Sequence, residues 1–494
     1  MQKLYKNCQN MDQRCYDEYG LSEDILMEHA AQGMADYINQ NFYEGTILIV
    51  CGIGNNGADG LALSRLLHHR FESIKVYLPF GTQSLMAKKQ LVRINKLDYV
   101  TIVDELSPAD IVVDALFGAG LNRPLSEKYQ NIIMQMNQLG GFKIACDVPS
   151  GLDEDGVIFS EIFDADVTLT MGARKEALYS DFAKDYVGRV YRLDLGVHYA
   201  SYTKDEPVSS YLLNPDDLNL PSRDFSKVTH KGDFGHVAVF CGEKEGAGII
   251  AAMASSRFGA GLTTLVTQKE IVPPPYLMHS TSLPEKSTAL AVGMGLGLSF
   301  DSAYLKQNVL NNTLPIVLDA DALYYADLLE VLEQKNREIV VTPHPKEFSA
   351  MWKILSGEEI DIEEIQERRF EMVRKFNRQY PHVTIILKGA NMIISEHEKL
   401  YINPHGSSKL SKGGTGDVLS GLIVSLLAQG YTAIDAAIHA TLALTLASAS
   451  HTMSAYALLP TDLIESVGQL NQENLDQEIA QKPPYIYFGS GKTE

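Results

Sequence analysis

Residues 46–67 read TILIVCGIGNNGADGLALSRLL, and this stretch predicts the fold of the first part of the chain. An apolar, β-branched run ends at Cys51, a turn with four glycines follows over residues 52–60, and the pattern becomes helical from Leu61. A strand, a glycine turn and a helix in this order are the first half of a βαβ unit. Such a turn presents unpaired backbone N–H groups at the start of a helix, where a ligand phosphate binds.

The same rhythm continues to residue 171. A helical segment near Ser22–Asn39, with one apolar face, precedes the first strand. Four further runs have the length and composition of buried strands: SIKVYLPF (73–80), DIVVDALF (110–117), FKIACDV (142–148) and DADVTLTM (164–171). The alternation predicts an α/β domain in three layers around a parallel sheet.

A polar segment over residues 199–233, rich in Asp, Ser and Pro, predicts a linker. Strand-like runs resume after it as HVAVFCG (236–242), GLTTLV (261–266), ALAVGMG (289–295), PIVLDAD (315–321), EIVVTPH (338–344) and VTIILKG (383–389). Since 494 residues exceed one ordinary domain, we expect two α/β domains, residues 1–204 and 205–494. The charged run from Glu358 to Arg378 predicts a solvated amphipathic helix. The apolar run from Ala433 to Ala449 predicts a packed core helix.

Composition restricts the partners and the compartment. The 62 acidic and 42 basic residues give a formal charge of −20, which disfavours nucleic acids and anionic membranes as partners. The five cysteines form no C-x-x-C pair, a pattern typical of neither a disulfide framework nor a zinc site. Because the first ten residues also lack the apolar run of a signal peptide, we expect a soluble protein of the reducing cytoplasm.

Two further strands of the first domain end in acids, Asp114 and Asp147. The carboxyl ends of parallel strands line one crevice, so these side chains should converge on the glycine turn. Oxygens of Asn56, Asp114 and Ser150 could hold a small cation there, although strand-end aspartates often only cap a helix. The second strand ends in YLPF (77–80), without the acid that holds a ribose, which disfavours an ordinary NAD-dependent dehydrogenase.

A second anion site is predicted at KGGTGD (412–417), where glycines open an apolar helix. Asp417 follows them where a base would accept the proton of a substrate hydroxyl, an arrangement typical of ribokinase-type folds, although an acid in a first turn can also only complement the helix dipole. The stretch is not a Walker A loop. Polar residues at other predicted strand ends favour a site: Asp319, Asp321, His344, Glu347 and Lys388. Of these, Lys388 suits nucleotide phosphates, Glu347 suits water-mediated Mg²⁺ binding, and His344 suits a polar substrate.

The order of these motifs resembles that of the bifunctional NAD(P)H-hydrate repair enzymes over nearly the whole chain. The motifs similar to the epimerase half are GIGNNGADG (52–60), DALFGAGLNRP (114–124), DVPSGLD (147–153) and TMGARKEAL (170–178). Those similar to the dehydratase half are HKGDFGHV (230–237), GAGLTTL (259–265), GMGLG (293–297), LDADAL (318–323), TPHPKE (342–347), LKGA (387–390) and GGTGDVLSG (413–421). The resemblance implies a Rossmann-like epimerase domain and a ribokinase-like dehydratase domain.

The resemblance also implies the chemistry. The first domain would interconvert the R and S epimers of hydrated NADH or NADPH, and the second would remove the added water at the expense of ADP or ATP, with ADP favoured. Asp147 and Asp417 would be catalytic, K⁺ would bind Asn56, Asp114 and Ser150, and Mg²⁺ would accompany the nucleotide. These small molecules are the expected partners, and we expect a homo-oligomer.

The implied binding residues fall into three sets. The epimerase set is Asn55, Asn56, Gly57, Ala58, Asp59, Gly118, Ala119, Gly120, Leu121, Asn122, Arg123, Pro124 and Asp147. The dehydratase set for the hydrate is Gly297, His344 and Asp417. The nucleotide set is Lys388, Gly389, Ala390, Asn391, Met392 and Gly416.

The chain departs from the family pattern at several positions. Gly406 is followed by SSKLSK, where Lys409 and Lys412 are expected to add charge beside the phosphate, and Lys346 and Met294 replace the usual glycine and proline. Two alternatives stay open. One is a ribokinase-type vitamin or sugar kinase fused to a non-catalytic dinucleotide-binding domain. The other is an N-terminal half that binds the hydrate without turning it over.

Overall fold

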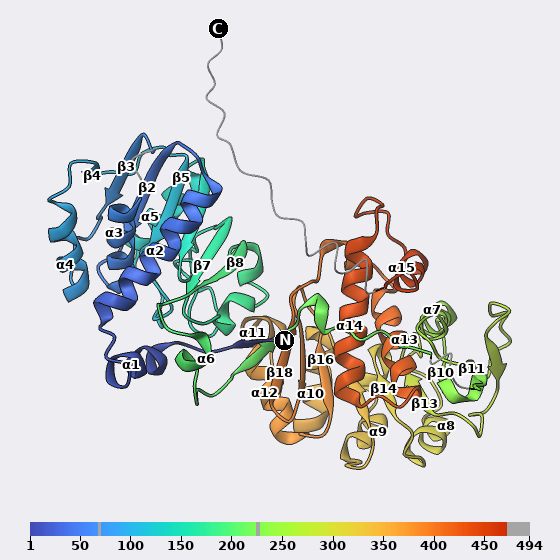
Figure 1. Ribbon diagram of the computed structural model, residues 1–494. Coiled ribbons are helices and arrows are strands. Elements are labelled where there is room, and N and C mark those ends of the chain that lie inside the picture. Colours follow the sequence, from blue (N-terminus) through green and yellow to red (C-terminus); the bar gives the residue numbers. More distant parts are fainter. Residues whose placement is uncertain (68–70, 224–227, 472–494) are drawn as a thin grey trace, which may run out of the picture. The chain divides into compact units, whose positions relative to one another are not determined.

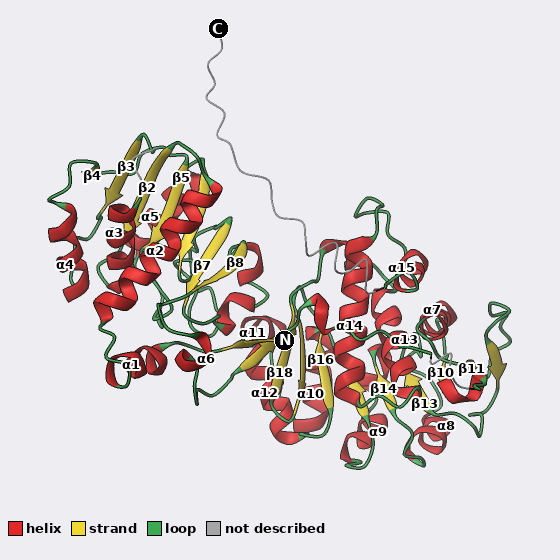
Figure 2. Ribbon diagram, viewed as in Figure 1, coloured by secondary structure: helices red, strands yellow, loops and turns green. Residues whose placement is uncertain are grey.

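The computed structural model describes residues 1–67, 71–223 and 228–471, which form two compact units (Figure 1). One unit is Lys3–Ser209, and the other runs from Ser210 onward and includes Met1 and Gln2. The chain therefore passes from one unit to the other between Ser209 and Ser210. The sequence predicts this boundary slightly earlier, after Lys204. Each unit contains one sheet with helices packed against it (Figure 2).

The Lys3–Ser209 unit contains a seven-stranded sheet in the order β4-β3-β2-β5-β6-β7-β8, with parallel pairing throughout. Its strands are β2 (Thr46–Cys51), β3 (Ser73–Tyr77), β4 (Val100–Val103), β5 (Ile111–Ala115), β6 (Phe142–Cys146), β7 (Val167–Met171) and β8 (Arg189–Leu193). Its helices are α1 (Gln9–Asp17), α2 (Glu23–Asn41), α3 (Asn55–Leu66), α4 (Leu85–Ile94), α5 (Glu127–Gln138) and α6 (Tyr199–Tyr202), with short 3₁₀ turns at Glu176–Tyr179 and Ala183–Asp185.

Alternation along β2 explains the three layers. Ile47 and Ile49 pack in one apolar cluster with α2, α3 and α4, whereas Leu48 and Val50 pack in a second cluster with α5. All four side chains are fully buried, as expected for a parallel strand covered on both faces. The predicted Rossmann-like three-layer architecture is confirmed. The strands end earlier than the apolar runs suggest, because the residues after Tyr77, Ala115 and Cys146 leave the sheet as loops.

The other unit contains an eleven-stranded sheet in the order β1-β9-β18-β17-β16-β15-β14-β13-β10-β11-β12. Its strands are β1 (Gln2–Leu4), β9 (Ser210–Leu212), β10 (His236–Phe240), β11 (Leu262–Val266), β12 (Met278–Ser280), β13 (Ala289–Val292), β14 (Ile316–Leu318), β15 (Ile339–Val341), β16 (Thr384–Leu387), β17 (Met392–Glu396) and β18 (Lys399–Asn403). Its α-helices are α7 (Glu245–Arg257), α8 (Ser302–Leu305), α9 (Ala326–Leu329), α10 (Pro345–Ser356), α11 (Ile362–Glu367), α12 (Arg369–Gln379), α13 (Thr415–Ala428), α14 (Ala433–Ser450) and α15 (Pro460–Val467). Short helical turns lie at Pro215–Asp217, Lys231–Phe234, Lys306–Leu310, Ala320–Tyr324, Glu330–Glu333 and Ser408–Leu410.

The strands from β10 to β16 that the sequence predicts pair in parallel, and β16, β17 and β18 pair antiparallel. Part of the predicted linker, β9, is itself a strand that pairs with β18. The interpretation of the charged run as one solvated helix is wrong. It forms two helices that meet at Arg368, and Arg369 is buried because carbonyl groups of a neighbouring loop bond its guanidinium.

The apolar helix α14 is buried over 78% of an 18-residue window that is long and apolar enough to cross a membrane. It packs in one cluster with α7, α13 and α15 against a face of the sheet, as the predicted core helix should. Within that cluster α13 approaches α7 closely at Gly421, since a β-carbon there would overlap the Ala251 carbonyl. This contact fixes the position of α13, and with it the glycine motif at its start.

We expect Gly421→Ala to destabilise this unit by about 1–3 kcal/mol, because the added methyl forces α13 and α7 apart. The single tryptophan, Trp352, is buried in the same unit, so its fluorescence during urea unfolding reports on this unit. The matched control is Gly246→Ala in α7, where a β-carbon meets no other atom, and its midpoint should equal or slightly exceed that of the wild type. An unchanged midpoint in Gly421→Ala would show that the contact does not constrain the packing.

Candidate active sites

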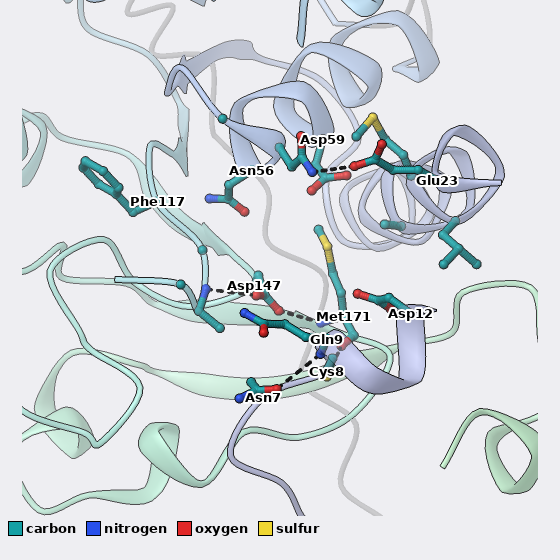
Figure 3. A pocket seen from close by; sticks show the side chains of 18 of the residues that line it. Asn7, Cys8, Gln9, Asp12, Glu23, Asn56, Asp59, Phe117, Asp147 and Met171 are labelled. Atoms are coloured by element: carbon teal, nitrogen blue, oxygen red, sulfur yellow. Dashed lines mark hydrogen bonds between the residues drawn. The ribbon is translucent and has the colours of Figure 1, made fainter. Parts of the chain in front are cut away.

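A cavity of about 550 Å³ lies in the Lys3–Ser209 unit, at the carboxyl ends of β2, β5, β6 and β7 (Figure 3). Its polar lining residues come from these strand ends, from α1, α2 and α3, and from α6: Asn7, Gln9, Asp12, Tyr16, Glu23, Asn55, Asn56, Asp59, Asp147, Lys175 and Tyr202. The crevice predicted at the carboxyl edge of the sheet is therefore present. Of the predicted loop after β5, Gly118, Ala119, Gly120 and Leu121 line the cavity.

The glycine turn forms the start of α3, which begins at Asn55, earlier than the sequence suggests. A β-carbon at Gly52 would overlap the Leu116 carbonyl, and one at Gly57 would overlap the Gly52 carbonyl. Because Ala58 makes the first helical bond, from its N–H to the Gly54 carbonyl at 3.2 Å, the preceding N–H groups lie ahead of the helical pattern. The turn can therefore offer these groups to an anion.

Asp114 lies fully buried at the end of β5 and is bonded to Ser150 at both carboxylate oxygens. The Ser150 backbone N–H donates to Oδ2 at 2.7 Å, and its hydroxyl donates to Oδ1 at 2.7 Å. The same hydroxyl oxygen accepts a bond from the Phe117 N–H at 2.9 Å. Burial raises the pKa of Asp114 to about 6, and the Ser150 hydrogen bonds offset this only in part.

Asp147 lies at the end of β6 with a left-handed backbone, φ 69°, and forms a buried ion pair with Lys175. The Lys175 ammonium also donates to the Met171 carbonyl at 2.8 Å and to the Thr170 hydroxyl at 3.2 Å. Burial alone would raise the pKa of Asp147, but the charge of Lys175 and its hydrogen bond hold it below the ordinary value. The carboxylate also accepts a bond from the Ala119 N–H at 3.3 Å, on the glycine loop after β5.

Lys175 lines the cavity, and the site prediction lacks it. It lies in the TMGARKEAL stretch (170–178). Its position shortly after a predicted buried strand is the sequence feature that could have indicated it. The burial of its side chain is readable only from the fold.

Asp59 and Asn56 lie on α3 and face the cavity together (Figure 3). Asp59 is 9% exposed, and burial, with Asp147 nearby, raises its pKa well above the ordinary value. The Asn56 side-chain nitrogen is buried and, within the described chain, has no hydrogen-bond partner. Both side chains are thus available to a ligand.

Five of the predicted epimerase residues do not line the cavity. Asn122, Arg123 and Pro124 are exposed on the loop that leads to α5, and Gly57 and Ala58 are buried within the first turn of α3. The first three follow the lining residues in sequence, but the chain has already turned away from the sheet edge. Gly57 and Ala58 shape the turn instead of contacting the cavity.

The N-terminal segment supplies a wall of the cavity that the site prediction also lacks. Asp12 on α1 accepts a bond from the Tyr202 hydroxyl at 2.7 Å, and Arg14 donates to the Tyr202 carbonyl at 2.9 Å. Both contacts join residues separated by almost the whole unit, so no local sequence pattern could reveal them. Cys8 lines the same wall, and all five cysteines of the chain are free.

In the unit from Ser210 onward, the GGTGD motif begins α13 as predicted. Gly414 is its N-cap with a left-handed φ of 96°, a conformation that glycine tolerates. Asp417 follows in the first turn, partly buried. Burial, with a contribution from the carboxylate of Asp319, raises the pKa of Asp417 to about 7.

Lys388 joins three predicted strand ends in one charged cluster. Its ammonium donates to Asp319 at 2.8 Å and lies 3.4 Å from a carboxylate oxygen of Glu347. The Ser420 hydroxyl donates to the other Asp319 oxygen at 2.7 Å, and a β-carbon at Gly416 would lie 3.6 Å from the Lys388 ammonium. Burial would raise the pKa of Asp319, but Lys388 outweighs it and holds that pKa below the ordinary value.

His344 has a structural role, and its contact with the hydrate stays a prediction. It caps α10, since its ring Nδ1 accepts a bond from the Glu347 N–H at 3.2 Å while Glu347 bonds the His344 N–H at 2.8 Å. Gly297 lies opposite Asp321, which accepts its N–H at 2.8 Å. Burial lowers the pKa of His344, although Glu347 counters it, which favours a neutral imidazole.

The predicted nucleotide segment, Lys388–Met392, forms the turn from β16 into β17. Gly389 and Ala390 are exposed, whereas Asn391 and Met392 are buried. The buried Arg369 bonds the carbonyls of Leu387, Lys388 and Asn391 at 3.0, 3.2 and 3.1 Å. Arg369, which the site prediction lacks, therefore fixes the backbone of this turn.

Lys409 and Lys412 direct their ammonium groups to backbone carbonyls. Lys409 donates to the carbonyls of Ser448 and His451 at the end of α14, at 3.3 and 2.9 Å, and Lys412 donates to the Tyr456 carbonyl at 3.0 Å. These carbonyls are neutral, so both lysines keep their charge, and their effect on a phosphate stays a prediction. Both lysines anchor the loop before α13 to the segment after α14.

Comparison with known proteins identifies both units. Residues 23–177 match the family model of the YjeF-related protein N-terminus, and residues 237–469 match that of NAD(P)H-hydrate dehydratase. Two relatives described as bifunctional NAD(P)H-hydrate repair enzymes come from Helicobacter pylori and Coxiella burnetii. The first is 39% identical over 95% of this chain and 100% of the relative, and the second is 33% identical over 88% and 92%.

A third relative of the same description, from Escherichia coli, is 30% identical over 79% of this chain and 78% of the relative. A Bacillus subtilis ADP/ATP-dependent NAD(P)H-hydrate dehydratase structure gives a TM-score of 0.45 at 25% identity over 55% of this chain and 98% of that chain. The matches to both halves favour a repair enzyme over a kinase fused to a dinucleotide sensor. The chain belongs to the family of bifunctional NAD(P)H-hydrate repair enzymes, which combine an epimerase and a dehydratase.

Proposed function

We propose that the Lys3–Ser209 unit is the NAD(P)H-hydrate epimerase and that the unit from Ser210 onward is the dehydratase. The observation that carries the proposal is that each unit combines a glycine-rich helix start, a carboxylate and a strand-end lysine. Asp147 is paired with Lys175 in one unit, and Asp417 lies in the first turn of α13 in the other, where the Lys388–Asp319 ion pair influences its pKa. The helix start suits the phosphates of a dinucleotide or nucleotide. The carboxylates suit proton transfer to and from a hydroxyl.

In the epimerase unit, Asp147 is the proposed catalytic group. Lys175 keeps it ionised inside the cavity, so it can accept a proton from water or from the hydroxyl of the hydrate. Asn55, Asn56 and the Gly118–Leu121 loop would bind the hydrate around it. Lys175 is already paired with Asp147. The phosphates of the hydrate would therefore bind backbone N–H groups and not this lysine.

K⁺ is the proposed resident cation of the epimerase, with Asn56, Asp114 and Ser150 as its ligands. All three offer oxygen atoms, the donors that hard cations prefer. The Asp114 carboxylate is fully buried and its partner Ser150 carries no charge, so a cation there would lower its raised pKa. Bound K⁺ would supply a positive charge that stabilises the loops after β5 and β6.

In the dehydratase unit, Asp417 is the proposed base. It would accept the proton of the substrate hydroxyl as that oxygen attacks the terminal phosphorus of the nucleotide, with AMP as the leaving group if ADP is used. The amides at the start of α13 would stabilise charge on the transferred phosphoryl group. Phosphate would then leave as the ring nitrogen donates its electron pair, and loss of a proton from the adjacent carbon would restore the double bond.

Lys388, Glu347 and Gly416 would contact the nucleotide, together with the turn over residues 389–392. Among the described residues no cluster of three histidine, cysteine or acidic side chains suits a metal. Mg²⁺ is usually held by one or two carboxylates and by substrate phosphates, so Glu347 with the nucleotide would suffice. Its bound charge would offset that of the phosphates.

The proposed compartment is the reducing cytoplasm, supported by five free cysteines. A homo-oligomer stays the expected assembly.

The assay for both activities supplies a mixture of R and S hydrates with ADP or ATP and follows reduced-nicotinamide absorbance. The wild-type enzyme should restore the full reduced-nicotinamide absorbance. Asp147→Asn should recover only the epimer that the dehydratase uses and then continue at the uncatalysed epimerisation rate, at least about 100-fold slower. Asp417→Asn should recover none while still binding nucleotide in calorimetry. No recovery by wild type with either nucleotide would refute the proposed function.

The pH dependence of dehydration tests Asp417 as the base. Its pKa of about 7 means that it is protonated, and inactive as a base, at lower pH. The turnover number should therefore fall about tenfold per pH unit below about 6 and level off above about 8. The enzyme's unfolding should be monitored at each pH by Trp352 fluorescence. A flat profile from pH 5 to 8 with folded enzyme would exclude this role.

Potassium dependence tests the proposed ligands. Epimerisation by dialysed wild type should rise when KCl replaces choline chloride at constant ionic strength, and Asp114→Asn should lose this response because it lacks the carboxylate charge. Epimers are separated by chromatography. The matched control, Asp155→Asn, removes an exposed carboxyl from the same unit and should respond as wild type does. Equal wild-type rates in both salts would argue against K⁺.

A further inference from the structure

The cavity holds a second carboxyl that the proposed mechanism does not use. Asp59 enters from α3, and Asp147 enters from the end of β6, so the two come from different walls (Figure 3). Asp59 is more than nine-tenths buried. Asp147, in contrast, is held by Lys175 and by two backbone N–H groups.

The groups that face Asp59 keep it different from Asp147. Asp12 on α1, Glu23 on α2 and Asp147 all disfavour a second negative charge, and Lys175 favours it more weakly. Burial acts in the same direction as the three carboxylates and raises the pKa of Asp59 well above its ordinary value. Asp147 keeps a lowered pKa. A pair of carboxyl groups, one with a raised and one with a lowered pKa, is typical of a site that uses one acid and one base.

The reacting carbon of the hydrate carries both the hydroxyl and the ring nitrogen, because hydration of an enamine double bond places oxygen beside nitrogen. One route to inversion of this carbon expels the hydroxyl from one face and adds water to the other. That route needs an acid on one side of the ring and a base on the other.

We infer that Asp59 is a second catalytic residue of the epimerase, acting with Asp147 on opposite faces of the hydrated ring. This inference rests on the proposed epimerase function of the unit. In one direction Asp59 donates its proton to the hydroxyl, the carbon–oxygen bond breaks with both electrons going to the departing water, and the nitrogen lone pair forms a carbon–nitrogen double bond. A water then attacks the opposite face, its oxygen forms the new bond, and Asp147 accepts its proton.

The net result is an inverted hydroxyl and one proton moved from Asp59 to Asp147. The reverse reaction uses the same two groups in exchanged roles, and proton exchange with solvent restores the starting state. Water enters and leaves, and no oxidant or reductant is needed. The alternative route opens the ring between carbon and nitrogen and recloses it, which retains the original oxygen.

The test uses the full-length enzyme without nucleotide, so that dehydration cannot occur, and one purified epimer in ¹⁸O-labelled water. The product epimer formed by wild type should carry the heavy oxygen, measured by mass spectrometry at early times against an enzyme-free control. Product with the original oxygen would overturn the inference while leaving the epimerase function intact. No epimerisation at all would instead refute the proposed function itself.

Asp59→Asn separates catalysis from binding. We expect its turnover number to fall at least about 100-fold, with KM within about threefold of wild type because the isosteric amide still fills the wall. Asp59→Glu should recover part of the lost turnover. The matched control is Asp36→Asn, an exposed carboxyl on α2, which should epimerise as wild type does. Dehydration by the same chains with ADP checks folding, and a raised KM with unchanged turnover would reduce Asp59 to a binding residue.

Discussion

An ion pair between a lysine and a strand-end aspartate organises each of the two sites. Lys175 pairs with Asp147 in one unit and Lys388 with Asp319 in the other. A buried carboxyl group without such a partner stays protonated and neutral. In both units the ion pair keeps the aspartate ionised instead. Each pair lies where parallel strands end, so the sheet can bury its apolar middle and still present a charged group at its edge.

Beside each pair lies a carboxyl group with the opposite tendency. Burial raises the pKa of Asp59 and of Asp417, whereas the paired lysines hold down those of Asp147 and Asp319. Both units thus place a readily protonated carboxyl near one that stays ionised. The two units differ in their surroundings: glycines begin α13 in one, and α1 and α6 form a further wall of the cavity in the other.

The sequence predicts well what short-range patterns encode. β2 and its glycine turn are visible in one stretch, the strand-end positions of Asp114 and Asp147 follow from topology, and the glycine motif before Asp417 marks the start of α13. The residues that it does not predict as site residues make their contacts with residues far away in the sequence. Arg369 looks like one more charge in a solvated run, yet it bonds carbonyls of the turn after β16. Lys409 lies close to the glycine motif in sequence, and no local pattern predicts that its ammonium group donates to the His451 carbonyl after α14.

A formal charge of −20 disfavours anionic ligands, and the cavity itself is lined mainly by acidic side chains among its charged residues. Three acids line it, Asp12, Glu23 and Asp59, in addition to Asp147, and its one lysine is already paired. If a phosphate binds there as proposed, we expect its binding energy to come from the N–H groups that begin α3, which carry partial charge at fixed positions. Because the close contacts of Gly52 and Gly57 leave no room for a β-carbon, they hold this turn, and with it these N–H groups, in place.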